Sequence, residues 1–237
     1  MWKVRIPQIF SDMESGVETK SNDTSIIILG AGGHSSSVAS VAISAGFKIR
    51  AFVDPLCQLG NHLGVPSYSS ITQIENFASY SFTIAVGDNS KRQEIYERAI
   101  EEFGSLRFPI LAHQSSVISS FSEVAEGTVI MPLSIVGPNS VVGKFCILNT
   151  RSSLDHDCLM QDFSSLAPGA ITSGLVTIGT RSAVSLGAVI KQRVTIGNDT
   201  IIGANSYVNQ DIESNCIAYG TPAKKIRFRN SKDSYLD

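Results

Sequence analysis

The 237-residue chain has few of the residues that build disulfide frameworks or metal sites. Only four cysteines occur, Cys57, Cys146, Cys158 and Cys216, and no two of them stand in CxxC spacing. That spacing is typical of zinc sites and redox motifs. We therefore expect the cysteines to be structural, and we expect no metal cofactor.

Excess charge and long apolar runs are also missing. The chain has 19 Lys and Arg residues against 21 Asp and Glu, so the charge balance favours neither a nucleic-acid partner nor a membrane surface. No apolar run approaches the roughly 20 residues of a membrane-spanning helix. Residues 1–24 lack the apolar core of a signal peptide. We expect a cytoplasmic protein that binds neither nucleic acid nor membranes.

What the chain does have is a strict six-residue repeat between Ile118 and Glu213. All sixteen positions of the register except Thr172 are aliphatic or methionine: Ile118, Val124, Ile130, Val136, Val142, Leu148, Leu154, Met160, Leu166, Thr172, Ile178, Val184, Ile190, Ile196, Ile202 and Val208. Two positions before each stands mostly Ser, Thr, Ala, Cys or Val. Neither a helical nor a plain strand period gives this spacing, whereas a short strict repeat indicates a solenoid.

Strand pleating converts the repeat into a shape. Residues two apart on a strand face the same side, so the small residue and the following aliphatic residue both point inward. Three strands and three corners close a triangular coil of about 18 residues, and the repeat gives about five coils. Each coil is stabilised by its neighbours rather than alone. An ordinary β-sandwich would need polar turns at irregular spacing. The sequence therefore predicts a parallel β-helix over residues 111–215.

Three short strands with glycine turns precede the repeat. We expect strands at 25–30, 48–54 and 81–89, helices at 38–46 and 91–104, and a short helix around 70–77. This βαβ pattern predicts a small Rossmann-like α/β domain over residues 25–110, too small for a complete dinucleotide fold but large enough for one nucleotide. Residues 1–24 would be an N-terminal arm or extension, and residues 216–237 a C-terminal segment and tail.

The glycine-rich turn over residues 30–37 is a candidate phosphate site. Glycines let the backbone approach a phosphate, and a helix start presents unpaired N–H groups and a positive dipole end. Asp54 ends the second strand and is placed to meet a ribose or base edge. Gly87 and Asn89 follow the third strand, on the same edge of the sheet. Ser35 replaces the third glycine of G-x-G-x-x-G, so a tight turn without a ligand is the alternative.

His156 is the one histidine in the repeat and the first candidate for catalysis. Counted from Leu154 it occupies a corner, so its side chain should point outward. Histidine accepts a proton readily near neutral pH, and a carboxylate on the far ring nitrogen fixes its tautomer. Asp157 is adjacent, but neighbours on a strand generally diverge, so the carboxylate could come from another chain. An exposed corner histidine without a function is the alternative.

The order of the motifs resembles one family. GAGGH follows the first strand, VD the second and AVGDN the third, and the repeat carries NT and then DHDC. This resembles the NeuD/PglD family of sugar O- and N-acetyltransferases over roughly residues 25–227. The resemblance implies an α/β N-terminal Rossmann-like nucleotide-sugar domain followed by an all-β left-handed parallel β-helix. It also implies acetyl-CoA as co-substrate, held in a groove between two prisms of a homotrimer.

The resemblance assigns roles to individual residues. His156 is implied to be the general base and Asp157 its support. Contacts with the nucleotide-sugar are implied at Gly32, Gly33, His34, Asp54 and Gly87, and we add Asn89 from its place on the same edge of the sheet. Contacts with CoA are expected at Ser165, Gly174, Leu186, Ala204 and Lys224. Some members have a second histidine where this chain has Ser165, so the backbone N–H of Ser165 or Gly174 becomes the candidate to polarise the thioester. Gly174, one coil after His156, would leave room beside the imidazole for an acetyl group.

We therefore predict an acetyl-CoA-dependent N-acetyltransferase that acts on a nucleotide-linked amino sugar, in the synthesis of bacterial surface-glycan precursors. The amine would attack the thioester directly, with no covalent enzyme intermediate. Sugar O-acetylation of the sialic-acid type stays open, because one histidine serves either nucleophile. A non-catalytic sugar-nucleotide-binding protein is a third reading. A zinc enzyme on the same fold needs about three histidine ligands, and the repeat supplies one.

Overall fold

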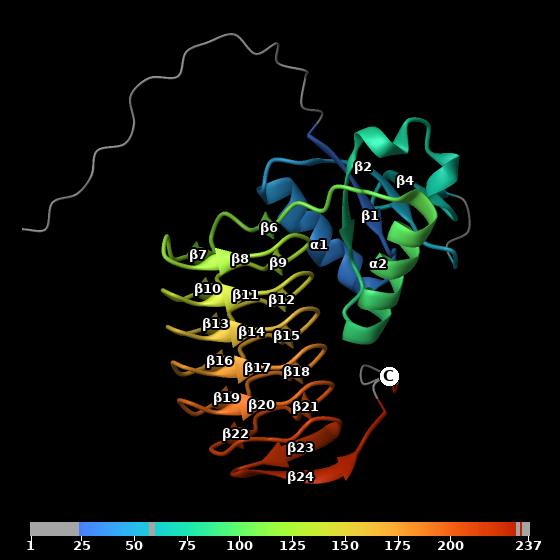
Figure 1. The fold of residues 1–237 in the computed structure, drawn as a ribbon. Coiled ribbons are helices and arrows are strands. Elements are labelled where there is room, and N and C mark those ends of the chain that lie inside the picture. The colour runs from blue at the N-terminus through green and yellow to red at the C-terminus, as the bar shows by residue number, and fades with distance from the viewer. Residues whose placement is uncertain (1–23, 57–59, 231–232, 234–237) are drawn as a thin grey trace, which may run out of the picture.

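The computed structural model describes residues 24–56, 60–230 and 233. They form a small α/β unit seated beside a tall stack of coils (Figure 1). The expected N-terminal arm lies outside the described residues apart from Thr24. Within the described part of the chain, no helix is long and apolar enough to cross a membrane.

A five-stranded sheet forms the centre of the α/β unit. Its strands are β1 (Ser25–Leu29), β2 (Lys48–Val53), β3 (Gly60–His62), β4 (Val65–Tyr68) and β5 (Ser81–Ile84), in the order β3-β4-β2-β1-β5. β1 runs parallel to β2 and β5, and β4 parallel to β2, whereas β3 pairs with β4 as an antiparallel hairpin that the sequence did not predict. Ile26, Ile27 and Ile28 are fully buried, as expected for a parallel strand covered on both faces.

Two helices and two short 3-10 helices complete this unit: α1 (Gly33–Ser44), α2 (Asn89–Phe103), η1 (Ile71–Gln73) and η2 (Phe77–Ser79). The β1–α1 turn requires a glycine at residue 30, since its φ is +108° and an added Cβ would lie 3.1 Å from the carbonyl oxygen of Ala85. α1 begins at Gly33, before the expected residue 38. α2 begins after Asp88, whose carboxylate accepts a hydrogen bond from the Lys91 N–H at 3.0 Å, an N-cap that satisfies one of the free donors of the helix start.

The coils form a prism with three faces. The first face consists of β7 (Val117–Ile118), β10 (Ile135–Val136), β13 (Ser153–Leu154), β16 (Ile171–Thr172), β19 (Val189–Ile190) and β22 (Tyr207–Val208). The second face consists of β8 (Glu123–Val124), β11 (Val141–Val142), β14 (Leu159–Met160), β17 (Thr177–Ile178) and β20 (Thr195–Ile196). The third face consists of β6 (Leu111–Ala112), β9 (Val129–Ile130), β12 (Ile147–Leu148), β15 (Ser165–Leu166), β18 (Ala183–Val184), β21 (Ile201–Ile202) and the hairpin β23 (Cys216–Gly220) and β24 (Ala223–Phe228).

Each two-residue strand pairs in parallel with the strand one coil further on, as Ser153 does with Ile135 and with Ile171. The predicted α/β domain followed by a parallel β-helix is thus confirmed. The first coil strand, β6, begins at Leu111, and an independent domain boundary near residue 110 stays a prediction.

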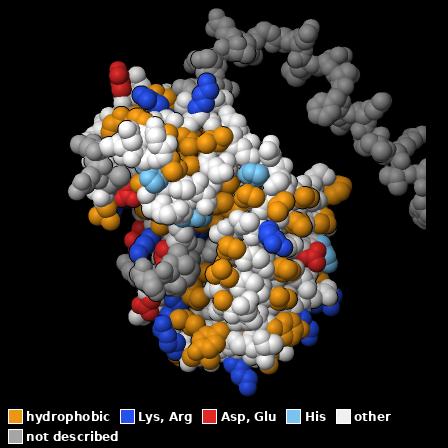
Figure 2. Space-filling view, turned by 180° about the vertical axis from the view of Figure 1, so that it is seen from behind, with side chains coloured by type: hydrophobic (Ala, Val, Ile, Leu, Met, Phe, Trp, Pro, Cys, Tyr) orange, Lys and Arg blue, Asp and Glu red, His pale blue; other side chains and the backbone are white. Residues whose placement is uncertain are grey.

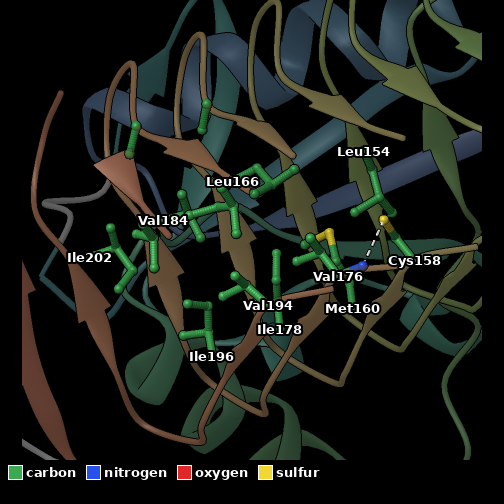
Figure 3. Close-up of a cluster of buried hydrophobic side chains, with 14 of the residues drawn as sticks. Leu154, Cys158, Met160, Leu166, Val176, Ile178, Val184, Val194, Ile196 and Ile202 are labelled. Atoms are coloured by element: carbon green, nitrogen blue, oxygen red, sulfur yellow. Dashed lines mark hydrogen bonds between the residues drawn. The ribbon is translucent and has the colours of Figure 1, made fainter. Parts of the chain in front are cut away.

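The prism interior is the column of side chains that the repeat predicts. Aliphatic positions are buried in every unit from Ile130 to Val208, and small positions from Thr128 to Ser206. Figure 3 shows these side chains meeting inside the prism. Ile118 departs from the expected inward burial and is 38% exposed, because it belongs to the first strand of its face and has no coil beyond it. The stacked interior gives the corners a rigid support.

Candidate active site

His156 lies at the corner between β13 on the first face and β14 on the second, and its side chain is 44% exposed. Its Nδ1 is 2.7 Å from Oδ2 of Asp157. Asp157 reaches the ring because it occupies the corner with a φ of 55°, so the alternating directions of strand residues do not apply to it. The carboxylate that bonds the imidazole therefore comes from the same chain, one of the two sources that the sequence left open.

The electrostatics of the pair suit a base. The hydrogen bond with Asp157 is the main cause that raises the pKa of His156 above its ordinary value; partial desolvation opposes it and the charge of Asp155 adds to it. The same hydrogen bond, followed by one from the Asn139 amide, lowers the pKa of Asp157. An ionised carboxylate at Nδ1 keeps the ring proton there and leaves Nε2 as the basic nitrogen.

Gly174 stacks on His156 as expected, but the imidazole itself fills the space that the glycine leaves. A Cβ on Gly174 would lie 2.3 Å from both Cε1 and Nε2 of His156. The expected place of an acetyl group beside the ring stays a prediction. Within the described residues the Gly174 N–H has no hydrogen-bond acceptor, while the neighbouring Leu175 N–H donates to the carbonyl oxygen of His156 at 3.0 Å.

Asn89 and Ser165 meet where the α/β unit packs on the third face. Asn89 is fully buried, and its Nδ2 donates to Ser165 Oγ at 3.2 Å and to the carbonyl oxygens of Arg181 and Ser182 at 3.1 Å each. The backbone N–H of Ser165 donates to the Ser182 carbonyl at 2.9 Å. Asn89 is thus a contact between the two units rather than an open substrate contact. Because the Ser165 N–H is already bonded, Gly174 is the remaining candidate to polarise a thioester.

Arg92 anchors the same contact, and the sequence reasoning missed it. Its side chain is 1% exposed and donates to the carbonyl oxygens of Phe145, Phe163, Val86 and Gly87 at 2.8 to 3.0 Å. Buried charges need such partners. Gly87, an expected substrate contact, therefore presents its carbonyl oxygen to Arg92. The only sequence signal was an arginine in the first turn of a helix that follows a glycine turn.

In the turn between β1 and α1, Gly32 and Gly33 face open space, whereas the side chain of His34 is partly buried. An added Cβ on Gly32 or Gly33 would have no heavy atom within 4 Å, so the space above both glycines is open. His34 turns inward instead, and its Nε2 is buried without a hydrogen-bond partner among the described residues. Burial, and then the charge of Arg92, lowers the pKa of His34 to about 4. His34 is therefore neutral at pH 7 and cannot attract a phosphate by charge.

A pocket of about 510 Å³ opens at the carboxyl ends of β1 and β2, lined among others by Gly30, Asp54, Lys91, Glu94 and Arg98. Asp54 Oδ2 accepts from the Ala31 N–H and Oδ1 from the Leu56 N–H, both at 2.9 Å. The volume lies in the usual range of roughly 300–1,000 Å³ for small-molecule sites. Of the six expected substrate contacts, Asp54 lines this pocket, and Gly32, Gly33, His34, Gly87 and Asn89 do not.

Of the expected CoA contacts, Gly174 stacks on His156, whereas Leu186, Ala204 and Lys224 lie away from it in a single chain. Leu186 and Ala204 are exposed at the corner between the third and first faces, and Lys224 is exposed on β24. His156 occupies a different corner. Figure 1 shows the α/β unit beside the third-face strands β9 and β12, with the first-face strands β10 and β13 on the far side of the prism. Within one chain, the pocket, the catalytic pair and the expected CoA contacts Leu186, Ala204 and Lys224 are therefore separate from one another.

Known proteins share this architecture. Residues 25–99 match the PglD N-terminal domain. The chain is 30% identical to GDP-perosamine N-acetyltransferase from Caulobacter crescentus, solved as a histidine-to-alanine variant in complex with CoA and GDP-perosamine, over 86% of this chain and 97% of that one, with a TM-score of 0.80. It is 31% identical to the acetyltransferase domain of PglB from Neisseria gonorrhoeae in complex with acetyl coenzyme A, over 86% and 100% of the two chains, also with a TM-score of 0.80.

Curated relatives match over shorter stretches. The GDP-perosamine N-acetyltransferase of Escherichia coli O157:H7 is 31% identical over 52% of this chain and 54% of that protein. The galactoside O-acetyltransferase of Escherichia coli K12 is 39% identical over 28% of this chain and 33% of that protein. The chain thus spans about half or less of the length of these curated relatives, whereas it spans nearly all of the two solved ones.

Proposed function

Because the chain belongs to the NeuD/PglD family of sugar acetyltransferases, we propose that it transfers the acetyl group of acetyl-CoA to the amine of a nucleotide-linked amino sugar. That it is an acetyltransferase using acetyl-CoA follows from the family. The N-acetylation, the nucleotide-linked acceptor and a place in the cytoplasmic synthesis of bacterial surface-glycan precursors are our proposal.

The observation that carries the proposal is the bonded His156–Asp157 pair at an exposed corner. Nε2 of His156 takes a proton from the amine as the N–C bond to the acetyl carbon forms and the C–S bond of the thioester breaks. The carboxylate of Asp157 stabilises the resulting imidazolium. We assign the N–H of Gly174, a residue that stacks on the ring, to the carbonyl oxygen as it becomes negative. This N–H has no acceptor of its own within the described residues.

The pocket at Asp54 is the proposed nucleotide site. Parallel α/β sheets bind nucleotides at the carboxyl ends of their strands, which is where this pocket opens. The solved relative from Caulobacter crescentus binds GDP-perosamine, so a GDP-linked amino sugar is the first acceptor to test. O-acetylation of a sugar hydroxyl is the second candidate, favoured by the match to galactoside O-acetyltransferase.

We further propose that three chains form a homotrimer with active sites between them. The first face carries an outward apolar column that only Ser153 on β13 interrupts: Val117 (60% exposed), Ile135 (42%), Ile171 (45%), Val189 (40%) and Tyr207 (38%). Figure 2 shows hydrophobic side chains repeated from coil to coil over the stack. Exposed apolar patches of this kind mark interfaces. The first face is bounded by the His156 corner on one edge and the Leu186 corner on the other, so three such faces around an axis bring these corners of neighbouring chains together.

The test is a thiol-release assay with acetyl-CoA against GDP-, UDP- and dTDP-linked amino sugars, with free sialic acid alongside. A general base contributes roughly 10²–10⁴-fold to rate, so His156→Ala should lower kcat by at least ~10²-fold while the melting temperature is retained. Lys144→Ala, at another corner where an exposed ion pair with Glu126 contributes little, is the matched control. Near-normal turnover by His156→Ala would show that the base lies elsewhere.

A further inference from the structure

We infer that Asn139 is a positioning residue of the catalytic pair, acting through Asp157, an inference that rests on the proposed function. Nδ2 of Asn139 lies 3.1 Å from Oδ1 of Asp157, while Oδ2 of the same carboxylate lies 2.7 Å from Nδ1 of His156. The two carboxylate oxygens thus have one partner each. An amide, a carboxylate and an imidazole form a continuous chain of hydrogen bonds along one corner of the prism.

The coil repeat places Asn139 there. It stands 18 residues before Asp157, which is one coil, so the two side chains occupy the same corner position in successive coils. Both residues are in the left-handed region, with φ of 58° and 55°. The backbone holds the coils in register at this point, since the Asp157 N–H donates to the Pro138 carbonyl at 2.9 Å and the Asn139 N–H to the Phe121 carbonyl at 3.1 Å. Asparagine tolerates this backbone conformation better than most residues do.

The contact controls which way the carboxylate turns. The terminal torsion of an aspartate side chain is broad, and the Asp157 side chain is 41% exposed, so without a second partner the carboxylate can rotate toward water. A neutral donor at Oδ1 fixes the rotation and leaves Oδ2 aimed at Nδ1. The other ionisable group beside the ring is Asp155, whose Oδ1 accepts from the His156 N–H at 2.8 Å and not from the ring. The ring tautomer therefore depends on Asp157, and Asp157 depends on Asn139.

The kinetic test is Asn139→Gly, alone and combined with Asp157→Ala. Glycine removes the amide and suits a φ of 58°, so the assembly should persist. We expect kcat to fall about 5-fold, the value of one hydrogen bond of roughly 1 kcal/mol, with the KM for acetyl-CoA unchanged. In the Asp157→Ala background the same substitution should have no further effect. Asn215→Gly, an exposed corner asparagine with a φ of 59°, is the matched control and should retain wild-type kcat.

A second readout needs no acceptor. Histidine ring ¹⁵N spectra of the free protein should show His156 as a single Nδ1–H tautomer, and Asn139→Gly should convert it to a mixture while the other histidines are unchanged. An unchanged spectrum, or equal kinetic losses with and without Asp157, would overturn the inference. If the wild-type protein acetylates no acceptor but the spectrum still depends on Asn139, the proposed function fails and the positioning role stands.

Discussion

At the level of single residues, the candidate site depends on a backbone conformation that sequence spacing does not reveal. The repeat predicted the outward direction of His156, because every corner of such a coil points outward. It did not predict that Asp157 would bond the ring, because that requires the left-handed φ of 55° at Asp157. It also placed Gly174 against His156, but it did not predict that the imidazole occupies the position of a Cβ at residue 174.

The pH dependence follows from the Asp157 contact. As a base, His156 must be neutral, so kcat/KM should rise with pH through the pKa of the free enzyme. The sequence alone places this midpoint near ~6.5, and the hydrogen bond with Asp157 raises the pKa of His156, so we expect the midpoint above that value. Asp157→Asn should move it down. The pKa of the amine substrate does not depend on Asp157. Identical pH profiles of kcat/KM for the wild type and Asp157→Asn would therefore show that the rise with pH reports ionisation of the substrate.

Gly174→Ala should displace the imidazole, since the added Cβ would lie 2.3 Å from Cε1 and Nε2. Misplacing a catalytic group by about 1 Å can cost ~10²-fold in rate, so we expect a kcat loss approaching that of His156→Ala, together with a lower melting temperature. In the His156→Ala background the clash is absent, and alanine at residue 174 should then leave the melting temperature unchanged. A Gly174→Ala enzyme with normal kcat would contradict the close contact between residue 174 and the His156 imidazole.

At the level of elements, the strands of the prism were predictable and the contact between the two units was not. The period of six determines every strand from β8 to β22, because each unit repeats the same burial pattern. Asn89 and Ser165 are 76 residues apart in the chain, and no pattern in either segment indicates that they meet. Arg92 likewise donates to the carbonyl oxygens of Phe145 and Phe163, which occupy the same corner in two successive coils. Packing between units depends on side-chain geometry that periodicity does not contain.

Burial of His34 at the start of α1 should make the free energy of unfolding depend on pH. The pKa of His34 is about 4 in the folded protein against 6.5 when it is exposed, so the unfolded state binds more protons between these values. The contribution of neutral His34 to the free energy of unfolding is then fully present above about pH 6.5 and is lost as the pH falls toward 4. From pH 7 to pH 5 the loss from this residue should be about 2 kcal/mol.

Urea unfolding at pH 7 and pH 5 measures this loss, with His34→Gln for comparison. The variant should lose less stability than the wild type over the same interval, because glutamine does not titrate. Carboxylates contribute equally to both proteins, so they cancel in the difference. Equal losses in the two proteins would show that His34 is accessible to protons in the folded state.

At the level of the whole molecule, the pieces of the proposed site are distributed over separate sides of one chain. The pocket lies in the α/β unit beside the third face, and His156 lies at the corner of the first and second faces. The exposed apolar column of the first face supplies a reason for chains to associate. Light scattering should therefore give a trimer, and an active monomer would contradict a site shared between chains.

Mixing two inactive chains tests the shared site directly. His156→Ala removes the base, and Glu94→Trp places a large side chain at an exposed α2 position that lines the pocket, which should block the nucleotide without disturbing the core. If each site combines the corner of one chain with the pocket of the next, mixed trimers contain intact sites. In a cyclic trimer assembled at random from equal amounts, about a quarter of the sites receive both intact parts, so co-expression should restore about a quarter of wild-type activity. Co-expression of His156→Ala with His156→Asn, which damage the same part, should stay inactive. If the first pair also stays inactive although native mass spectrometry shows mixed trimers, the pocket and His156 must serve one site within a single chain, and the trimer would have to be explained by stability alone.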